Sequence, residues 1–465
     1  METQSKPLFS GKDLVKISLP LIIQQILAVT IGAVDTMMVS AAGEAAVSGV
    51  SNVNTLDTML VLLFSSLVSG GSVVVSQLLG RKNPGEARAA AKQLLYITTI
   101  VAAFITVTVL LLRDPLLHLL FGKSDADVMY HSKRYFSFVA LSFPLLAIES
   151  SGAALFRVMG NSLISMEVSI MMNLINVTGN ALLIYGVGLG AAGAAIATLC
   201  SRFVGATVML VLITKKKYPV HIEKLLHYRP NFQSIREILR IGVPNGIENG
   251  MFHFGKLITQ VLISSMGTAA NAANAVAATL ANYQYMPGTA FSSTMVTVVG
   301  RCVGAGEKEQ AKRYTRILVA ATYVSLWVVV LATFLFAKPI IAAYQLSADA
   351  SEIAHSLIIY HASIAVFLWP IAFTLPTAFR SASDVRFPLI VSMFSMWTFR
   401  VALSYVFSLS VVSIPRLGIS IPGFGLGPLG VWVAMTVDWV FRTVLFLTRY
   451  FNGKWLKAYK IRSGE

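Results

Sequence analysis

Asp35 stands inside the first apolar segment of the chain, residues 14–40, which carries no positive residue beyond Lys16. An ionised side chain inside a membrane is costly unless a partner or water receives it, and such acids often mark ion pathways. Gln24 lies three helical turns earlier on the same face. Two interpretations stay open: a carboxyl hydrogen-bonded to neighbouring helices or close to the membrane surface, or a site that binds a proton or cation during transport.

A second polar face lies in the apolar segment 162–185. Ser169, Asn173, Asn176 and Asn180 follow one another at intervals of three or four residues, so all four side chains point to one side of a helix. Lipid cannot satisfy their donors and acceptors, and the face must therefore meet other helices or water. It predicts interhelical packing, a polar binding wall, or both.

Six side chains are candidate contacts for a transported compound: Gln24, Asp57, Glu248, Arg400, Tyr283 and Met286. Glu248 is alternatively solvated near the inner membrane boundary. Arg400 lies deep enough to pair with an acid, or else close to the outer half of its helix. Tyr283 and Met286 are typical of a core, but soft and aromatic walls also suit a cleft that accepts varied organic cations.

The composition indicates an integral membrane protein. Of 465 residues, 55% are hydrophobic and only 12% are charged, and the mean hydropathy is +0.71. Apolar runs recur at the length that crosses about 30 Å of hydrocarbon. Helices are favoured over a barrel because lipid-facing strands would alternate apolar and polar residues. The first segment has no cleavage site, so we expect it to remain as a membrane helix.

The apolar runs predict an all-α fold with twelve transmembrane helices. The predicted spans are residues 14–40, 46–79, 93–112, 135–155, 162–185, 190–213, 238–265, 270–300, 315–337, 353–378, 387–410 and 428–448.

The distribution of Lys and Arg predicts the orientation. With a cytoplasmic N-terminus, 27 of the 37 basic residues fall in inside regions or at the inner ends of spans, 6 in outside loops and 4 deeper within spans. The positive-inside rule therefore places both termini in the cytoplasm. The net charge of +16 is a topology signal, and we reject a nucleic-acid partner. Cys200 and Cys302 lie in or at the end of apolar segments and are interpreted as packing residues.

The chain is an internal repeat. We expect a six-helix N-terminal lobe (1–214), a cytoplasmic linker (215–236) and a six-helix C-terminal lobe (237–465). A shift of 224 residues gives 14 identities in 75 ungapped pairs. Repeats that both start inside are parallel, which predicts two pseudo-symmetric bundles related by an axis along the membrane normal, around a central cleft. The paired residues include Pro20 with Pro244, Gly43 with Gly267, Gly80 with Gly304 and Ala87 with Ala311.

The shift also separates the acids. Gln24 pairs with Glu248, whereas Asp35 pairs with Thr259, which cannot titrate. Ion coupling is therefore expected in the N-terminal lobe alone.

The sequence contains no phosphate loop, no cluster with metal-ligand spacing and no nucleophile elbow. We expect neither an enzyme nor an ATP-driven pump, and no cofactor. Transport would have to use an ion gradient.

Several ordered motifs resemble the multidrug and toxic compound extrusion (MATE) family of bacteria across nearly the whole chain. They are Pro20 followed by Val34-Asp35-Thr-Met-Met-Val, Gly80-Arg81-Lys82 to Ala87 with its counterpart at Gly304 to Ala311, Asn173-x-x-Asn176 before Ile184-Tyr185-Gly186, and Gly190-x-x-Gly193-Ala-Ala-Ile-Ala-Thr198.

The resemblance implies an antiporter that exports organic, often cationic, compounds in exchange for H⁺ or Na⁺ by alternating access. It also implies an ion-coupling site of Asp35, Asn173, Asn176 and Asn180, with Na⁺ near Asp35, Asn176 and Asn180. Many relatives have an aspartate where Asn180 stands, so the coupling ion stays open. We expect a monomer in the bacterial plasma (inner) membrane.

The alternative is a lipid or lipid-linked oligosaccharide flippase of the same superfamily. A continuous cationic cleft would favour it, and Lys256, Arg380 and Arg400 are the candidates for its walls.

Overall fold

The computed structural model describes residues 6–122, 124–225, 227–414 and 419–459. Four basic residues of the charge count lie outside this part of the chain: Lys123, Arg416, Lys460 and Arg462. The chain divides into two compact units, one up to Gly246 and one from Ile247 onward. The division falls within a helix, and the predicted linker belongs to the first unit.

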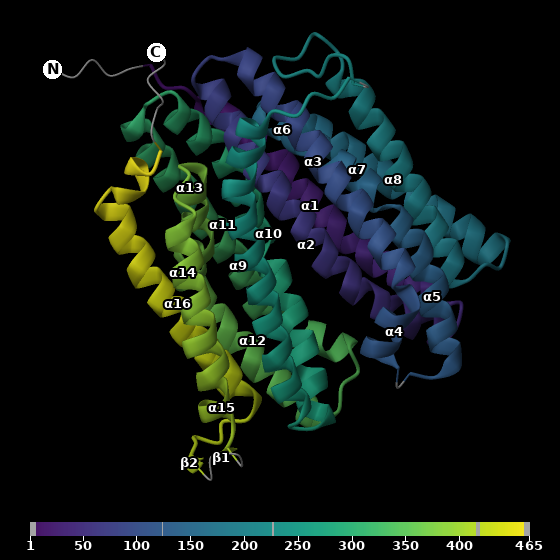
Figure 1. The fold of residues 1–465 in the computed structure, drawn as a ribbon. Helices are drawn as coiled ribbons and strands as arrows, with labels where there is room; N and C mark the ends of the chain where they lie inside the picture. The colour runs from purple at the N-terminus through teal and green to yellow at the C-terminus, as the bar shows by residue number, and fades with distance from the viewer. Residues whose placement is uncertain (1–5, 123, 226, 415–418, 460–465) are drawn as a thin grey trace. The chain divides into compact units, whose positions relative to one another are not determined.

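Unit 1 is built from helices (Figure 1). They are α1 (Gly11–Ser40), α2 (Glu44–Gly80), α3 (Pro84–Leu111), α4 (Arg113–Phe121), α5 (Ala126–Leu141), α6 (Phe143–Val158), α7 (Ser162–Asn180), the π-helix η1 (Ala181–Gly186), α8 (Ala191–Ile213) and the first part of α9 (Phe232–Ser264).

Unit 2 contains the rest of α9 and the later elements (Figure 1). They are α10 (Thr268–Gly304), α11 (Lys308–Ala343), α12 (Ala348–Trp369), the π-helix η2 (Pro370–Thr374), α13 (Leu375–Ser381), α14 (Arg386–Ser395), the π-helix η3 (Met396–Ala402), α15 (Leu403–Ser408), β1 (Val411–Ile414), β2 (Ile419–Pro422), α16 (Pro428–Phe451) and the 3₁₀ turn η5 (Lys454–Lys457).

Each of the twelve predicted segments falls on a helix or a run of consecutive helices. Within the described residues, nine helices or helix runs are long and apolar enough to span a membrane, and a tenth span results if α5 and α6 count as one across their 46° bend. The remaining two predicted spans are α9 and α10, which have 33 and 37 residues but carry more polar side chains. The protein is therefore a helical multi-pass membrane protein. The antiparallel hairpin β1–β2 lies in the last predicted outside loop.

The repeat is also visible in the element boundaries. α2 and α10 both contain 37 residues, and the glycines that precede them, Gly43 and Gly267, have φ values of 97° and 108°. An L side chain rarely adopts this backbone conformation, which explains why glycine occupies both positions. α1 and α9 end at Ser40 and Ser264, again 224 residues apart.

The first unit also holds the predicted linker in place. The Lys92 ammonium of α3 donates to the backbone oxygens of Glu223, Lys224 and His227 at 3.3, 3.1 and 2.8 Å. Tyr96 stacks on Tyr228 with ring centroids 4.3 Å apart. Glu223, Lys224, His227 and Tyr228 of the predicted linker thus contact α3.

Candidate functional site

Asp35 meets the asparagine face of α7. Its carboxylate Oδ1 accepts a hydrogen bond from Asn180 Nδ2 at 2.6 Å. Asn180 is 1% exposed and is the last residue of α7, directly before the π-helix η1. π-Helical turns often occur at functional sites because they re-aim the side chains around them. A charge-assisted hydrogen bond therefore joins two of the predicted ion-coupling residues, 145 residues apart.

The side-chain amide of Asn176 completes this contact. With its nitrogen toward Asp35, it donates to Oδ1 at 2.7 Å and Oδ2 at 3.3 Å, while its oxygen accepts from the Thr198 hydroxyl at 3.1 Å. In the reverse orientation Nδ2 donates to Thr198, and two acceptors face each other unless the carboxyl carries a proton. The hydrogen-bond network assigns such an orientation. The orientation of the Asn176 amide therefore depends on whether Asp35 is ionised or protonated.

Oxygen atoms are the natural ligands of a hard cation, and this region offers several. Asn180 Oδ1 is buried without a hydrogen-bond partner among the described residues. The Asp35 carboxylate and the Thr198 hydroxyl lie on the neighbouring helices α1 and α8. Oxygen atoms of this kind can bind Na⁺, and the carboxylate can instead accept a proton. Asn173 lies on the same helix, but its buried Nδ2 has no such partner in the described chain.

The other two candidates in unit 1 lie apart from this contact. Asp57 on α2 forms an ion pair with Arg202 on α8, with Oδ2 and Nη2 3.6 Å apart. Arg202 also donates to the Ser142 hydroxyl at 2.7 Å. Gln24 is half-buried on α1, and within the described residues no hydrogen bond connects it to Asp35.

In unit 2, Glu248 is buried and paired. It is 8% exposed, and its Oε1 accepts from Arg380 Nη2 at 2.7 Å and from the Ser392 hydroxyl at 2.8 Å. The structure therefore places Glu248 in a closed ion pair between α9, α13 and α14, not in solvent at a membrane boundary.

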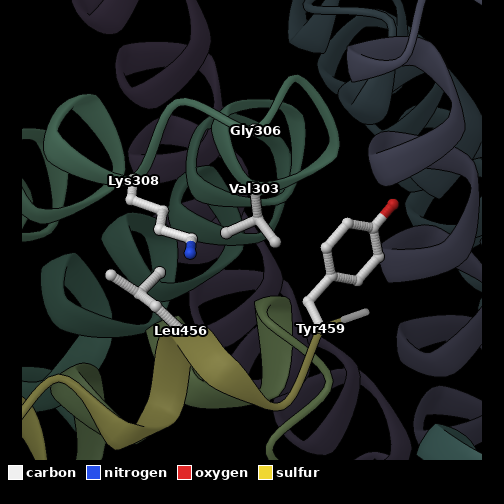
Figure 2. A pocket seen from close by; sticks show the side chains of 5 residues that line it. All are labelled: Val303, Gly306, Lys308, Leu456 and Tyr459. Atoms are coloured by element: carbon white, nitrogen blue, oxygen red, sulfur yellow. The ribbon is translucent and has the colours of Figure 1, made fainter. Parts of the chain in front are cut away.

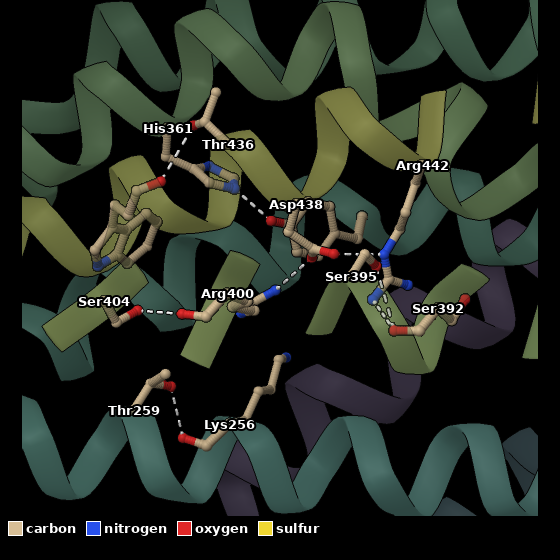
Figure 3. Close-up of polar contacts among 12 residues, drawn as sticks. Lys256, Thr259, His361, Ser392, Ser395, Arg400, Ser404, Thr436, Asp438 and Arg442 are labelled. Atoms are coloured by element: carbon tan, nitrogen blue, oxygen red, sulfur yellow. Dashed lines mark hydrogen bonds and ion pairs between the residues drawn. The ribbon is translucent and has the colours of Figure 1, made fainter. Parts of the chain in front are cut away.

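Arg400 belongs to a second charge cluster, shown in Figure 3. Asp438 on α16 is fully buried and accepts from Arg442 Nε at 2.8 Å. Arg442 also donates to the Ser392 backbone oxygen at 3.1 Å. Arg400, on η3, lies on the other side of the same carboxylate, with Nη1 3.9 Å from Asp438 Oδ2. One acid thus serves two guanidinium groups.

A single aromatic ring contacts three cations of this region. The Phe252 ring centroid lies 5.2 Å from Lys256 Nζ, 5.3 Å from Arg400 Cζ and 5.5 Å from Arg442 Cζ. Such contacts stabilise a cation through the quadrupole of the ring. The Lys256 ammonium contacts the Phe252 ring. Within the described residues, this ammonium forms no hydrogen bond and no ion pair. The three cations and Asp438 form what we call the unit 2 cation cluster.

The two α10 candidates lie in different surroundings. Met286 is buried at 7% exposed. Tyr283 is 41% exposed, and the described residues record no contact of either side chain with the unit 2 cation cluster. The neighbouring Tyr285 stacks on Trp369 with centroids 4.9 Å apart and hydrogen-bonds His361.

A small pocket lies elsewhere in unit 2. It has a volume of ≈ 200 Å³ and is lined by Val303, Gly306, Lys308, Leu456 and Tyr459 (Figure 2). None of the predicted site residues lines it.

Sequence reasoning did not select Asp438, Arg442 or Phe252 as site residues. The spacing of Asp438 and Arg442, four residues apart in an apolar helix, was a usable signal because such side chains meet on one helix face. Nothing in the sequence singles out Phe252, which is one of 26 phenylalanines. The cations around its ring identify it only once the chain is folded.

A helical multi-pass membrane protein built as an internal repeat, with a partly buried acid in one half and a cluster of cations in the other, has the architecture typical of a transporter. The MatE family model matches the chain twice, at residues 20–182 and 244–406. The second match is displaced from the first by 224 residues, the shift of the internal repeat. The chain belongs to the MATE family.

Relatives of this family match over nearly the full length. The chain is 27% identical to an uncharacterized transporter, YisQ, of Bacillus subtilis, over 97% of this chain and 96% of that protein. It is also 27% identical to the probable multidrug resistance protein NorM of Thermotoga maritima, over 96% and 93%. A MOP superfamily transporter from Pyrococcus furiosus, described as having a binding pocket of reverse polarity that suggests a different function, has the same fold, with a TM-score of 0.85, 19% identity and 96% of both chains covered.

Proposed function

We propose that this protein is a secondary active antiporter that exports organic compounds in exchange for H⁺ or Na⁺ by alternating access. The observation that carries the proposal is the contact of Asp35 with Asn180. The family resemblance implies amphipathic organic cations as substrates. The proposal also includes a monomer in the bacterial plasma (inner) membrane, with both termini cytoplasmic and a central cleft between the lobes.

The geometry around Asp35 supports an ion-dependent switch. An ionised Asp35 accepts from the amides of Asn180 and Asn176, and a hydrogen bond to a charged group contributes about 1.5–3 kcal/mol. When a proton or Na⁺ neutralises the carboxylate, these bonds weaken and the Asn176 amide can turn toward Thr198. A free-energy change of this size shifts a two-state equilibrium about tenfold or more, which is enough to couple ion binding to the packing of α1 on α7.

The relatives support export of small compounds. The Thermotoga maritima relative carries the name of a probable multidrug resistance protein over nearly the same length. An ion-coupled exporter of that kind needs one group that changes charge and a scaffold with two states, and Asp35 in a repeat of two six-span halves supplies both.

The test is transport into vesicles of purified protein under separately imposed pH and Na⁺ gradients, with a fluorescent organic cation as the reporter. Asp35→Asn keeps the size of the side chain and removes its charge change, so gradient-driven transport should be lost. Glu44→Gln, an exposed acid at the start of α2, is the matched control and should transport like the unchanged protein. Undiminished transport by Asp35→Asn contradicts the proposal.

A lipid or lipid-linked oligosaccharide flippase is the second candidate. The unit 2 cation cluster favours it, because an anionic headgroup would meet Lys256 and Arg400 rather than an acid. A transporter of this fold from Pyrococcus furiosus is described as having a binding pocket of reverse polarity. Movement of labelled phosphatidylglycerol between leaflets without any ion gradient would favour the flippase, and movement of organic cations only with a gradient would favour the antiporter.

A further inference from the structure

We propose that unit 2 binds an oxyanion, a carboxylate, sulfonate or phosphate, on an aromatic or amphipathic compound, between Lys256, Arg400 and the ring of Phe252. The inference rests on the proposed transport function and deepens it by assigning a charge and a shape to the substrate. It differs from the cationic substrate that the family resemblance implies, so the vesicle test of the antiport uses dansylglycine as well as the organic cation as its reporter.

The charge balance of the cluster is the first argument. Lys256, Arg400 and Arg442 surround one ring, and Asp438 is the carboxylate that contacts this group. The nearby Glu248 is already paired with Arg380. Three cations therefore share one acid in a region where Arg400 and Arg442 are 7% and 2% exposed. Buried charges are stable only when paired, so this excess calls for a negative partner.

The hydrogen bonds show which cations are available to such a partner. Arg442 is held firmly, at 2.8 Å from Asp438 and 3.1 Å from the Ser392 backbone oxygen. Arg400 is not, because its Nη1 stands 3.9 Å from Asp438 and its buried Nε has no hydrogen-bond partner in the described chain. Asp438 Oδ2, which faces Arg400, likewise accepts no hydrogen bond there. Arg442 is a structural cation, whereas Arg400 retains unused donors.

Lys256 supplies the second available cation. Its side chain rises from α9 toward the segment that carries Arg400 (Figure 3). The residue as a whole is partly exposed, but its ammonium is shielded from water. Within the described residues it contacts the Phe252 ring and forms no ion pair. A point charge from one side and a planar fork from the other are the usual arrangement around an oxyanion.

The aromatic surroundings favour a ligand with an apolar body. Phe252 packs edge to face on Phe373 with centroids 5.9 Å apart, and the Arg442 guanidinium also lies over the Phe373 ring, 5.5 Å from its centroid. Binding sites for organic molecules combine such walls with a few placed polar groups. A free inorganic anion would use the cations but not the rings. The site therefore suits an organic anion or the phosphate of a lipid headgroup.

The experiment is equilibrium binding to the full-length protein in neutral detergent, with two dansyl probes that differ only in charge. The first probe, dansylglycine, carries a carboxylate. The second probe is a dansyl amide that carries a trimethylammonium group in place of the carboxylate. Dansyl fluorescence rises when the ring leaves water. We expect dansylglycine to bind at least about tenfold more tightly than the cationic probe. Equal binding of the two probes, or tighter binding of the cation, overturns the inference.

Three lysine variants make the test specific. Lys256→Gln should weaken dansylglycine about tenfold, since it removes a charge-assisted contact, and Lys256→Arg should restore most of the binding. Lys338→Gln makes the same change at an exposed lysine of α11 and should bind as the unchanged protein does. Equal losses in Lys256→Gln and Lys338→Gln overturn the proposal. Thermal unfolding of each variant checks that it is folded.

Competition identifies the source of the anion. In nanodiscs, displacement of dansylglycine by phosphatidylglycerol but not by phosphatidylcholine assigns the site to an anionic lipid headgroup, and the absence of displacement assigns it to a soluble organic anion. Displacement by both lipids equally shows that the cations do not select the ligand and overturns the inference. The binding assay needs no gradient, so loss of coupling in Asp35→Asn bears only on the proposed antiport, and loss of binding in Lys256→Gln only on this site.

Discussion

The two repeats place different chemistry on corresponding helices. In unit 1, α1, α7 and α8 bring together Asp35, two asparagines and Thr198. In unit 2, the matching segments α9, η3 and α16 bring together Lys256, Arg400, Asp438 and Arg442. The first group holds one acid among neutral amides, and the second holds three cations around one acid. The same backbone frame therefore presents opposite charge in its two halves.

This difference teaches how a duplicated fold separates its tasks. Thr259, the counterpart of Asp35, donates its hydroxyl to the backbone oxygen of Lys256 at 2.9 Å and cannot change charge. If the two proposals above are correct, ion coupling lies in unit 1 and substrate recognition in unit 2.

Both groups also lie at irregular helix turns. Asn180 directly precedes η1, and Arg400 lies within η3. A π-helical turn shifts the side chains around it from the ordinary helical spacing. Both halves thus carry a π-helical turn next to the group, but with a different side chain.

The largest effect is expected from Asp438→Asn. The change leaves Arg400 and Arg442 buried without a counter-charge, and breaking a buried ion pair in this way costs about 3–5 kcal/mol. The measurement is the unfolding free energy of the purified protein in detergent. Asp384→Asn is the matched control: Asp384 forms an ion pair with Arg449, whose side chain is 21% exposed and can turn to water. Similar losses in both variants would show that the unit 2 cation cluster is not specially dependent on its acid.

The next effect separates the two asparagines of α7. Asn180→Leu removes the 2.6 Å donor to Asp35, which is worth about 1.5–3 kcal/mol as a hydrogen bond to a charged group. Gradient-driven transport in vesicles should fall about tenfold or more. Asn173→Leu, on the same helix, removes an amide whose Nδ2 has no partner in the described chain, and should have the smaller effect. The reverse order would move the ion site away from Asn180.

A smaller effect is expected at the other acid of unit 1. Asp57 and Arg202 are 3.6 Å apart and 19% and 15% exposed, so water and the Ser142 hydroxyl can still receive Arg202 after Asp57→Asn. We expect a loss of about 1 kcal/mol in unfolding free energy. A loss as large as that of Asp438→Asn would mean that acids in both units are equally essential to folding.

The smallest change introduces the missing acid into unit 2. Thr259→Asp places a carboxylate three residues after Lys256, within reach of an intrahelical pair. It should weaken dansylglycine binding about threefold by occupying the ammonium. Thr259→Val, which has the same shape without charge, is the control. Unchanged binding in Thr259→Asp would show that Lys256 does not face the probe.

Much of the fold was predictable because it depends on local pattern. The twelve segments follow from apolar runs of spanning length, and the prediction of a helical two-repeat transporter is confirmed by the family match at residues 20–182 and 244–406. Hydropathy did not predict the bend between α5 and α6. It also did not distinguish α9 and α10, which are more polar than the other spans. The roles of Asp35, Asn173, Asn176 and Asn180 stay predictions.

The site partners depended on packing. Glu248 was open to a solvated interpretation, because its partner Arg380 lies 132 residues away. Arg400 was a candidate acid partner without a named acid, and Asp438 emerged only when η3 and α16 were placed side by side.

By itself the sequence determined the membrane spans, the repeat, and the difference between Asp35 and its counterpart Thr259. These properties depend only on hydropathy and on the spacing of residues along the chain. Only the tertiary structure decided that Asn180, and not Gln24, meets Asp35, and that three cations of unit 2 share one ring and one carboxylate. Electrostatic energy depends on distance and burial, and helix packing sets both between residues that are far apart in the chain.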